Sequence, residues 1–171
     1  MVNGTMGAGK TSTCLQLLEK LQPSVLLDGD WCWKMNPFVV TEETKRMVTD
    51  NIAYLLRSFL LCSQCRNVIF CWVMHRESIM DDILKRLEGL QYEVYRFTLT
   101  VSRRALTERI TRDIENGLRT PDVLNRSLER LPLYDSMATH KIDVSDVTPA
   151  QAAEVILNSL KESDNHAPIR S

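Results

Sequence analysis

The chain has 171 residues, of which 44% are hydrophobic and 25% are charged. This length fits one compact domain, and these proportions exclude a disordered or fibrous protein. The 21 basic and 22 acidic residues give a net charge of −1, so no overall charge favours nucleic acid or an anionic membrane as a partner.

No apolar run approaches the roughly 20 residues that a membrane-spanning helix needs, and the N-terminus lacks a signal-peptide pattern. The number of cysteines is odd, at five. Only Cys62 and Cys65 form a C-x-x-C pair, and no second pair or histidine cluster completes a zinc site. We therefore interpret the cysteines as reduced thiols and expect a cytoplasmic monomer or homodimer with neither nucleic acid nor a membrane as a partner.

Short buried strands alternate with helical patterns along the chain. The predicted strands cover residues 1–3, 24–28, 67–73, 92–99 and 140–144. Apolar residues three and four apart predict helices over 11–21, 42–63, 79–87 and 106–114, and helix-start signals follow at Thr120-Pro121 and Thr148-Pro149. This alternation is typical of a doubly wound α/β sheet. We expect a single domain over residues 1–162 and a flexible tail over 163–171.

The segment after the first strand matches the Walker A pattern G-x-x-x-x-G-K-[ST] at every fixed position. Glycines let the backbone wrap closely around phosphates, and successive N–H groups at a helix N-terminus form a nest for anions. Lys10 is expected to reach the β- and γ-phosphates of a nucleotide, and the Thr11 hydroxyl to take a Mg²⁺ position. The predicted nucleotide-binding residues of this segment are Gly4, Met6, Gly7, Ala8, Gly9, Lys10, Thr11 and Ser12. A dinucleotide fingerprint is disfavoured, because it requires glycine or alanine in place of Ser12.

Two carboxylates follow the second predicted strand. Asp28 and Asp30 flank Gly29 at the carboxyl end of that strand, where open parallel sheets bind ligands. The next strand, over 67–73, lacks the aspartate of a Walker B strand. A Mg²⁺ shell would then use Thr11, phosphates, water and Asp28, a sparse set that suits this ion. The alternative interpretation of the two acids is a turn with solvated carboxylates.

Arginines are concentrated between residues 96 and 130, which hold eight of the chain's fourteen and no lysine. Arginine suits bidentate contacts to phosphate oxygens. A loop over about 116–122, with Arg119 at its centre, is a candidate lid between two predicted helices. The arginines expected to contact nucleotide or acceptor are Arg109, Arg112, Arg119 and Arg126, whereas Arg103, Arg104 and Arg130 fit a solvated helix.

These features together resemble the small P-loop kinases. That group includes the shikimate, gluconate, adenylylsulfate and adenylate kinases, AAA-type nucleotide kinases and the resistance phosphotransferases. The resemblance covers about residues 1–160, and only the Walker A segment is highly specific. It implies a five-stranded parallel sheet in the order 2-3-1-4-5, ATP and Mg²⁺ as cofactors, and a mobile lid.

The resemblance also implies roles for the polar residues. Asp30 would accept or orient the proton of the attacking hydroxyl, and Asp28 would assist Mg²⁺ or touch the acceptor. In the related kinases, arginines clamp the transferring phosphoryl group and stack on adenine. This implies catalytic roles for Arg109 and Arg119 and a nucleotide contact for Arg112.

The acceptor is expected between Asp30 and the helix that begins near Thr41. His75 and Arg126 are further candidate contacts, although a helix-start histidine without a partner is an equal alternative. Trp33 lies in a segment of rings and a thioether that suits stacking on a sugar, a base or an aromatic antibiotic, or that forms a local hydrophobic plug.

Three functions follow from these residues. The first is a kinase that transfers the γ-phosphoryl group of Mg-ATP to a hydroxyl of a small molecule. The second, a close variant, is a nucleoside monophosphate kinase. The third is a regulatory nucleotide-binding switch with slow hydrolysis. The two acids and the arginine-rich lid favour a kinase.

Overall fold

The computed structural model describes residues 1–166, and their side chains as far as 162. It contains a parallel sheet of five strands in the order β2-β3-β1-β4-β5. This result confirms the predicted fold class and strand order. The strands are β1 (Val2–Gly4), β2 (Ser24–Asp28), β3 (Asn67–Cys71), β4 (Phe97–Thr100) and β5 (His140–Asp143). The helices are α1 (Lys10–Lys20), the 3-10 helix η1 (Gly29–Trp33), α2 (Glu42–Leu61), α3 (Glu77–Lys85), α4 (Arg103–Glu115), α5 (Asp122–Asp135) and α6 (Pro149–His166).

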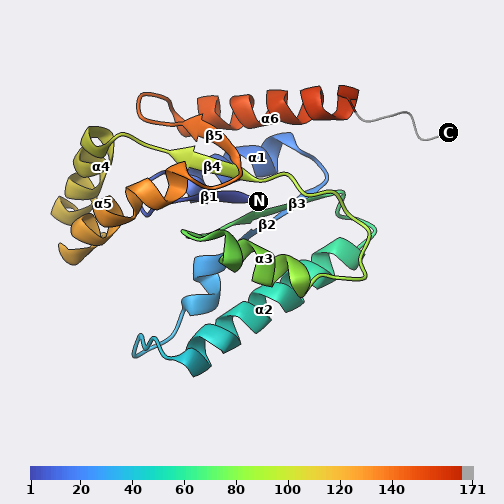
Figure 1. The fold of residues 1–171 in the computed structure, drawn as a ribbon, viewed down its shortest axis with the longest axis horizontal. Coiled ribbons are helices and arrows are strands. Elements are labelled where there is room, and N and C mark those ends of the chain that lie inside the picture. Colours follow the sequence, from blue (N-terminus) through green and yellow to red (C-terminus); the bar gives the residue numbers. More distant parts are fainter. Residues whose placement is uncertain (167–171) are drawn as a thin grey trace.

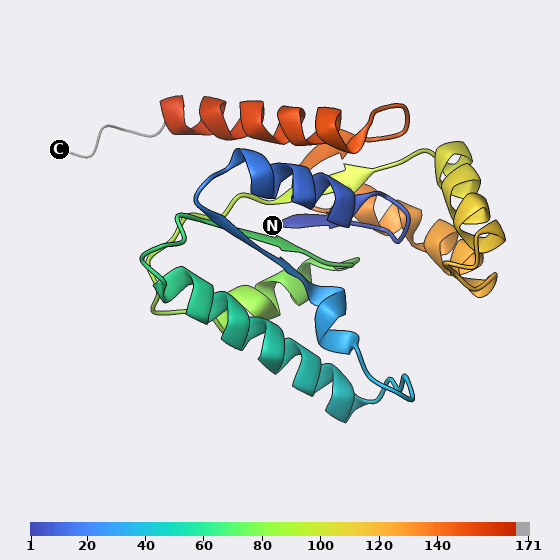
Figure 2. The ribbon, with the colours of Figure 1, turned by 180° about the vertical axis from the view of Figure 1, so that it is seen from behind.

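Helices cover both faces of the sheet. Helices α1 and α6 lie on one face and α2 and α3 on the other, while α4 and α5 lie beyond the carboxyl ends of the strands (Figures 1 and 2). Within the described residues, no helix combines the length and the apolar character that crossing a membrane requires. The tail expected over 163–171 lies outside the described residues from 167 onward, and α6 itself continues to His166.

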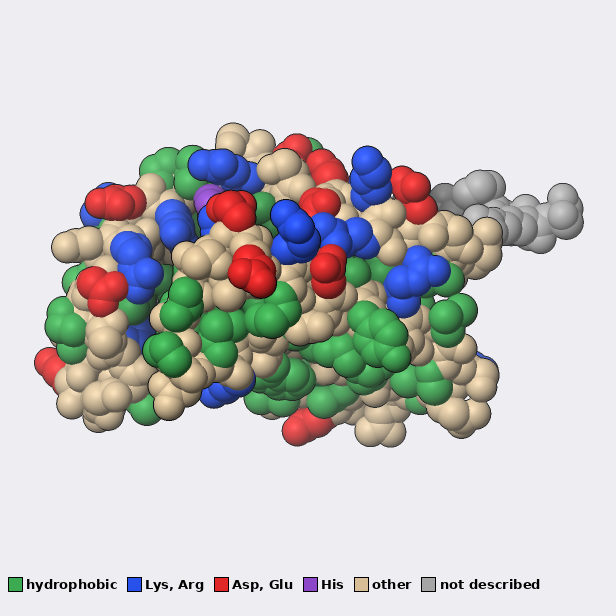
Figure 3. Space-filling model, turned by 90° about the horizontal axis from the view of Figure 1, so that it is seen from below, with side chains coloured by type: hydrophobic (Ala, Val, Ile, Leu, Met, Phe, Trp, Pro, Cys, Tyr) green, Lys and Arg blue, Asp and Glu red, His purple; other side chains and the backbone are tan. Residues whose placement is uncertain are grey.

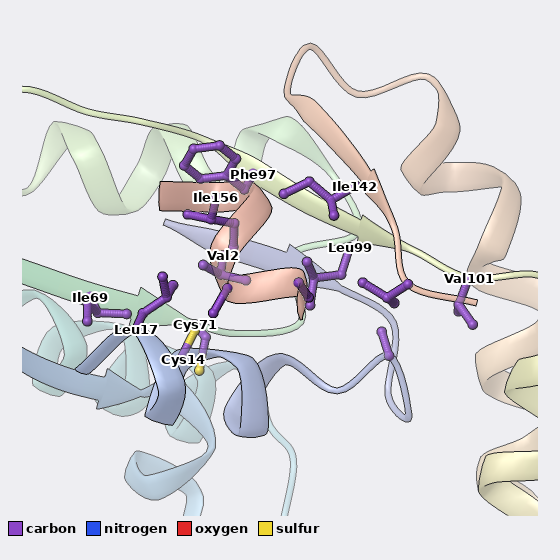
Figure 4. Close-up of a cluster of buried hydrophobic side chains, with 14 of the residues drawn as sticks. Val2, Cys14, Leu17, Ile69, Cys71, Phe97, Leu99, Val101, Ile142 and Ile156 are labelled. Carbon is purple, nitrogen blue, oxygen red and sulfur yellow. The ribbon is translucent and has the colours of Figure 1, made fainter. Parts of the chain in front are cut away.

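Two hydrophobic clusters, one on each side of the sheet, hold these layers together. Figure 4 shows the first, in which Leu17 of α1 and Ile156 of α6 pack over Val2 and Leu99 in the strands. In the second, Ile52 of α2 and other side chains of α2 and α3 pack against the opposite face. Bunched apolar strands are what a sheet buried on both faces requires.

The predicted helix boundaries lie within three residues of the observed ones, and some helix starts carry a local capping signal. The start of α6 is one example. The Thr148 N–H donates to Gln151 Oε1 over 2.8 Å, and the Gln151 N–H donates to Thr148 Oγ1 over 3.3 Å, which is the expected capping box.

The prediction of a strand over 92–99 was wrong at its beginning, since β4 starts only at Phe97. A parallel strand needs neighbours, and both neighbours of β4 begin at this level. Val2 of β1 and His140 of β5 are both in register with Phe97. The preceding residues therefore have no strand to pair with, whatever their β-propensity.

The central strand β1 has only three residues, and a side chain reinforces it. Asn3 is fully buried. Its Nδ2 donates to the Met74 carbonyl oxygen, and its Oδ1 accepts from the Met74 N–H, each over 2.8 Å. This pair of hydrogen bonds fixes β1 to the segment that follows β3. It thereby fixes the start of the Walker A segment, which comes directly after Asn3.

Gly4 joins β1 to that segment at a φ of +149°, and a Cβ there would lie 2.8 Å from the Leu99 carbonyl oxygen. We expect Gly4→Ala to destabilise the fold by about 2–4 kcal/mol, because the substitution adds a backbone clash to the strain of a positive φ. Urea unfolding measures the loss. Gly89→Ala is the control, since Gly89 has a φ of +86° but open space around it. Equal losses in the two variants would contradict the clash.

Candidate functional site

The Walker A segment forms a closed loop between β1 and α1. Gly7 and Gly9 adopt positive φ values of 82° and 89°, and Gly9 is the N-cap of α1. The Ala8 N–H donates to the Thr5 carbonyl oxygen over 3.3 Å. A Cβ on Gly7 would lie 2.8 Å from Ile110 of α4, so this helix packs directly on the loop. The loop geometry thus depends on glycine at both positions.

Lys10 is buried beneath this loop. Its ammonium donates to the Thr5 carbonyl oxygen over 2.9 Å. Burial lowers the pKa of Lys10, and the negative charges of Asp30 and Asp28 oppose that shift. The ammonium is therefore bonded to the loop and lies within electrostatic range of both acids.

The two acids at the end of β2 lie beside Thr11. The Thr11 hydroxyl donates to Asp28 Oδ2 over 2.6 Å, and Asp28 Oδ1 accepts from the Asp30 N–H over 3.0 Å. Asp28 is buried, and it is the N-cap of η1. The solvated-turn interpretation therefore fails for Asp28. A hydroxyl oxygen and a carboxylate oxygen in contact are hard donors of the kind that Mg²⁺ takes, so these two residues fit that ion.

Asp30 faces the same side from η1. Its Oδ1 accepts from the Trp72 indole N–H over 3.1 Å. Burial and then the Asp28 carboxylate raise the pKa of Asp30, while the Lys10 ammonium, the Trp72 hydrogen bond and the Arg119 charge lower it. A Cβ on Gly29 would lie 2.5 Å from the Trp72 ring, so glycine at this position is what lets the ring reach Asp30. Trp72 stands in the segment where a Walker B aspartate was missing, and sequence reasoning assigned it no role.

Arg119 lies in the loop between α4 and α5, as expected. Its Nε forms an ion pair with Asp113 Oδ2 at 2.7 Å. The charge of Arg119 acts on the pKa values of both Lys10 and Asp30. The candidate lid thus brings one cation to the side of the loop that carries the acids.

The other candidate arginines lie elsewhere. Arg126 forms an exposed ion pair with Asp122, four residues earlier on α5, at 2.7 Å. Arg112 is exposed, and its side chain makes no hydrogen bond or ion pair with the described residues. The ion pair of Arg126 is not specific to a site, because charges four residues apart on a helix pair readily in any protein.

Arg109 lines a small pocket beside the loop rather than facing Lys10. The pocket has a volume of about 210 Å³, and its walls include Gly9, Thr13, Val147 and Pro149. The guanidinium donates to the Val144 carbonyl oxygen and, over 3.1 Å, to that of Ser145. A planar cation anchored in this way offers a flat surface to an aromatic ring. Ligands of open parallel sheets bind at the carboxyl ends of the strands, so the residues that follow β5 could have predicted this pocket.

His75 and Trp33 lie on the acceptor side. His75 follows β3, and its Nδ1 has no hydrogen-bond partner among the described residues. Burial and then the positive charge of Arg130 lower its pKa. Trp33 is half-buried and packs against the second cluster, and its ring centroid lies 5.7 Å from that of Phe38. It therefore acts at least partly as the expected hydrophobic plug.

Sequence reasoning missed one group of polar side chains on α5. The hydroxyls of Ser127 and Tyr134 are buried and have no partner among the described residues. Arg130 lies between them in sequence and is half-buried, not solvated as expected, and its charge also acts on the pKa of Tyr134. Spacings of three and four residues place these side chains on one helix face, and this spacing could have predicted the group from the sequence. Buried polar atoms without partners are what a polar ligand would satisfy.

A larger cavity, of about 520 Å³, lies away from this site. Its walls include Met1, Asn67, Tyr92 and Phe97, at the amino ends of the strands. Ligands of open α/β sheets bind at the opposite edge. The site described above therefore remains the candidate despite its smaller volume.

Comparison with known proteins agrees with this geometry. Residues 1–131 match the model of a family described as AAA domain. The fold is similar to that of a gluconokinase from Sinorhizobium meliloti 1021, with a TM-score of 0.68, 19% identity, and coverage of 98% of this chain and 95% of the other. It is also similar to the tunicamycin resistance protein of Deinococcus radiodurans, with a TM-score of 0.63, 23% identity, and coverage of 93% and 92%.

A third similar structure is a shikimate kinase from Acinetobacter baumannii in complex with shikimate, with a TM-score of 0.63, 20% identity, and coverage of 95% and 92%. A search of curated proteins finds no match. The chain belongs to the AAA domain family, and its fold is that of the small P-loop kinases.

Proposed function

We propose that the protein is a kinase that transfers the γ-phosphoryl group of Mg-ATP to a hydroxyl of a small molecule. The observation that carries this proposal is the meeting of four groups at one edge of the sheet. The charge of Asp30 acts on the buried Lys10 ammonium, and Asp28 bonds to the Thr11 hydroxyl at 2.6 Å. The kinases among the similar structures support the same reaction class.

In this proposal the nucleotide lies along the Walker A loop. Residues 4–12 direct N–H groups at the phosphates, and Lys10 binds the β- and γ-phosphates. Thr11 and Asp28 would hold Mg²⁺, which neutralises phosphate charge when bound. The base occupies the pocket of Arg109 and Pro149, so Arg109 binds nucleotide rather than the transferring group.

The acceptor hydroxyl meets Asp30, which takes or orients its proton. Arg119 stabilises the charge of the transferring group when the loop over 116–122 closes as a lid. The carboxylate is suited to this task because the Trp72 indole fixes one of its oxygens. We propose three further acceptor contacts, namely His75, Trp33 and Arg130.

The test is ATP consumption against a panel of nucleosides, nucleoside monophosphates, sugars, shikimate-like acids and antibiotics. Consumption that depends on one class of hydroxyl compound supports the kinase, and dependence on a nucleoside monophosphate selects its nucleotide-kinase variant. Hydrolysis that is independent of every acceptor and unaffected by Asp30→Asn would contradict the proposal and favour the regulatory switch.

The base pocket gives a prediction for nucleotide affinity. We expect Arg109→Ala to weaken ATP binding about tenfold, because the variant loses a stacking cation worth about 1–2 kcal/mol. Calorimetry with ATP and with free triphosphate separates the effects, since only ATP carries the base. Arg103→Ala, at an exposed position on the same helix, is the control. An equal loss for triphosphate would show that Arg109 acts on the phosphates instead.

The Trp72 hydrogen bond gives a prediction for pH dependence. Asp30 must be ionised to accept a proton, so the rate falls as the pH drops through its pKa, which lies above the ordinary value of 3.8. Trp72→Phe removes a donor that lowers this pKa. We therefore expect the acid limb of kcat to move to higher pH, by up to about one unit. An acid limb that stays in place would assign the limb to another group.

A further inference from the structure

An exposed apolar surface adjoins Asp30. The residues just after it in the chain leave much of their apolar surface in solvent, although the segment is short and close to the core. Phe38 is 67% exposed and Val40 is 53% exposed. We define the apolar shelf as the exposed apolar side chains of this segment and of the first turns of α2, namely Trp31, Phe38, Val39, Val40 and Met47.

The segment divides its side chains between two environments. Cys32, Trp33 and Met35 pack against the second cluster and fasten the segment to the sheet. Phe38 then rests on Trp33 with the ring planes at 52°. The shelf is therefore supported from beneath. Exposed apolar residues that follow one another on a supported surface mark a binding site more often than chance exposure.

The composition of the segment indicates what would cover the shelf. Between Trp31 and Val40 the only charged side chain is Lys34. A polar acceptor would find only the single charge of Lys34 there, whereas an apolar body would remove the shelf from water at about 25 cal/mol per Å².

The position of the shelf connects it to the reaction. Trp31 directly follows Asp30, and η1 and the loop to α2 lie at the same end of the sheet as α4 and α5 (Figures 1 and 2). Figure 3 shows the molecule from the side of α2, where hydrophobic side chains gather in one half of the face and charged ones in the other. The shelf therefore begins at the residue next to Asp30, at the end of the sheet that carries the site.

We infer that the acceptor is amphiphilic, with an apolar body that covers Phe38, Val39 and Val40 while one of its hydroxyls reaches Asp30. This inference rests on the proposed kinase function and narrows its substrate class. It separates this chain from kinases whose acceptors are wholly polar, because such an acceptor would leave the shelf in water.

The experiment measures binding as a function of apolar length. Methyl, butyl, hexyl and octyl glucosides share one hydroxylated head group and differ only in methylene number. Each is titrated calorimetrically into the protein saturated with a non-hydrolysable ATP analogue. We expect affinity to rise about two- to fourfold per methylene, since a buried methylene contributes about 0.8 kcal/mol at most.

Two variants locate the effect. The double variant Phe38→Ser, Val40→Ser should flatten the dependence on chain length. Leu61→Ser is the matched control, because Leu61 is 69% exposed but lies at the far end of α2, about 20 Å along the helix from Met47, the shelf residue on this helix. It should keep the slope of the unmodified protein. Affinity that does not depend on chain length, or a slope unchanged in the double variant, would overturn the inference.

A second copy of the chain is the competing occupant. Sedimentation of the unmodified protein and the double variant distinguishes it. A dimer that dissociates in the double variant assigns the shelf to self-association and overturns the inference. The proposed function fails separately, if the ATP analogue gives no heat of binding. In that case, titration of the glucosides into the protein without nucleotide still tests whether the shelf binds apolar chains.

Discussion

Lys10→Met is expected to abolish ATP consumption with every acceptor. The methionine side chain has similar length but no charge, so the β- and γ-phosphates lose the cation that would stabilise charge during transfer. The loss should reach at least about 10³-fold in kcat, the scale found when one such cation is removed from a phosphoryl-transfer site. A coupled assay of ADP release measures it.

Burial makes a folding control necessary for this variant. Lys10 is buried and donates to the Thr5 carbonyl oxygen, yet burial lowers its pKa, so an apolar replacement is not expected to unfold the protein. Circular dichroism and urea unfolding check this. Lys45→Met, at an exposed ion pair with Glu42, should leave turnover unchanged. Full turnover in Lys10→Met would refute the phosphate-site assignment.

Asp30→Asn is expected to lower kcat by about 10²–10⁴-fold while the affinity for ATP changes little. The amide keeps the shape of the carboxylate and can still accept from Trp72, but it cannot take a proton from an acceptor hydroxyl. Separate measurements of kcat and of nucleotide affinity by calorimetry distinguish loss of chemistry from loss of binding.

Asp81→Asn is the matched control for this second variant. Asp81 is an exposed carboxylate on α3 whose ion pair with Arg96 spans 3.5 Å, and its loss should not affect turnover. A kcat for Asp30→Asn within about twofold of the unmodified protein would remove Asp30 from the reaction. The proposal would then have to place the acceptor hydroxyl elsewhere.

Much of the fold could be predicted because its signals are local. The Walker A glycines, the capping box before α6 and the bunched apolar strands each act within a few residues. The start of β4 could not be predicted in this way, since it depends on where β1 and β5 begin. Pairing between strands distant in sequence leaves no mark on the sequence of one strand alone.

The residues of the site likewise differ in whether local sequence signals could predict their contacts. The contact of Thr11 with Asp28 follows from the packing of α1 over β2 and β3, which brings the first turn of this helix to the end of β2. Trp72 and Arg130 were missed because they act on residues that are distant in sequence. Trp72 donates to Asp30, and the charge of Arg130 lowers the pKa of His75. The sequence predicted a catalytic role for Arg109, and the structure places this residue in the wall of the pocket beside the loop. Helix periodicity gives the face on which such a side chain lies but not the depth at which a long side chain ends.

The hydrogen bonds of Asn3 restrict how the glycine loop can be moved into another protein. A strand of three residues offers too few ladder bonds to hold a loop in place by itself, and one carboxamide supplies the missing anchorage from the neighbouring segment. Transplanting the glycine loop into another sheet would therefore require the asparagine and its backbone partner to travel with it. In evolution, the glycine loop and the asparagine should therefore be exchanged or retained together.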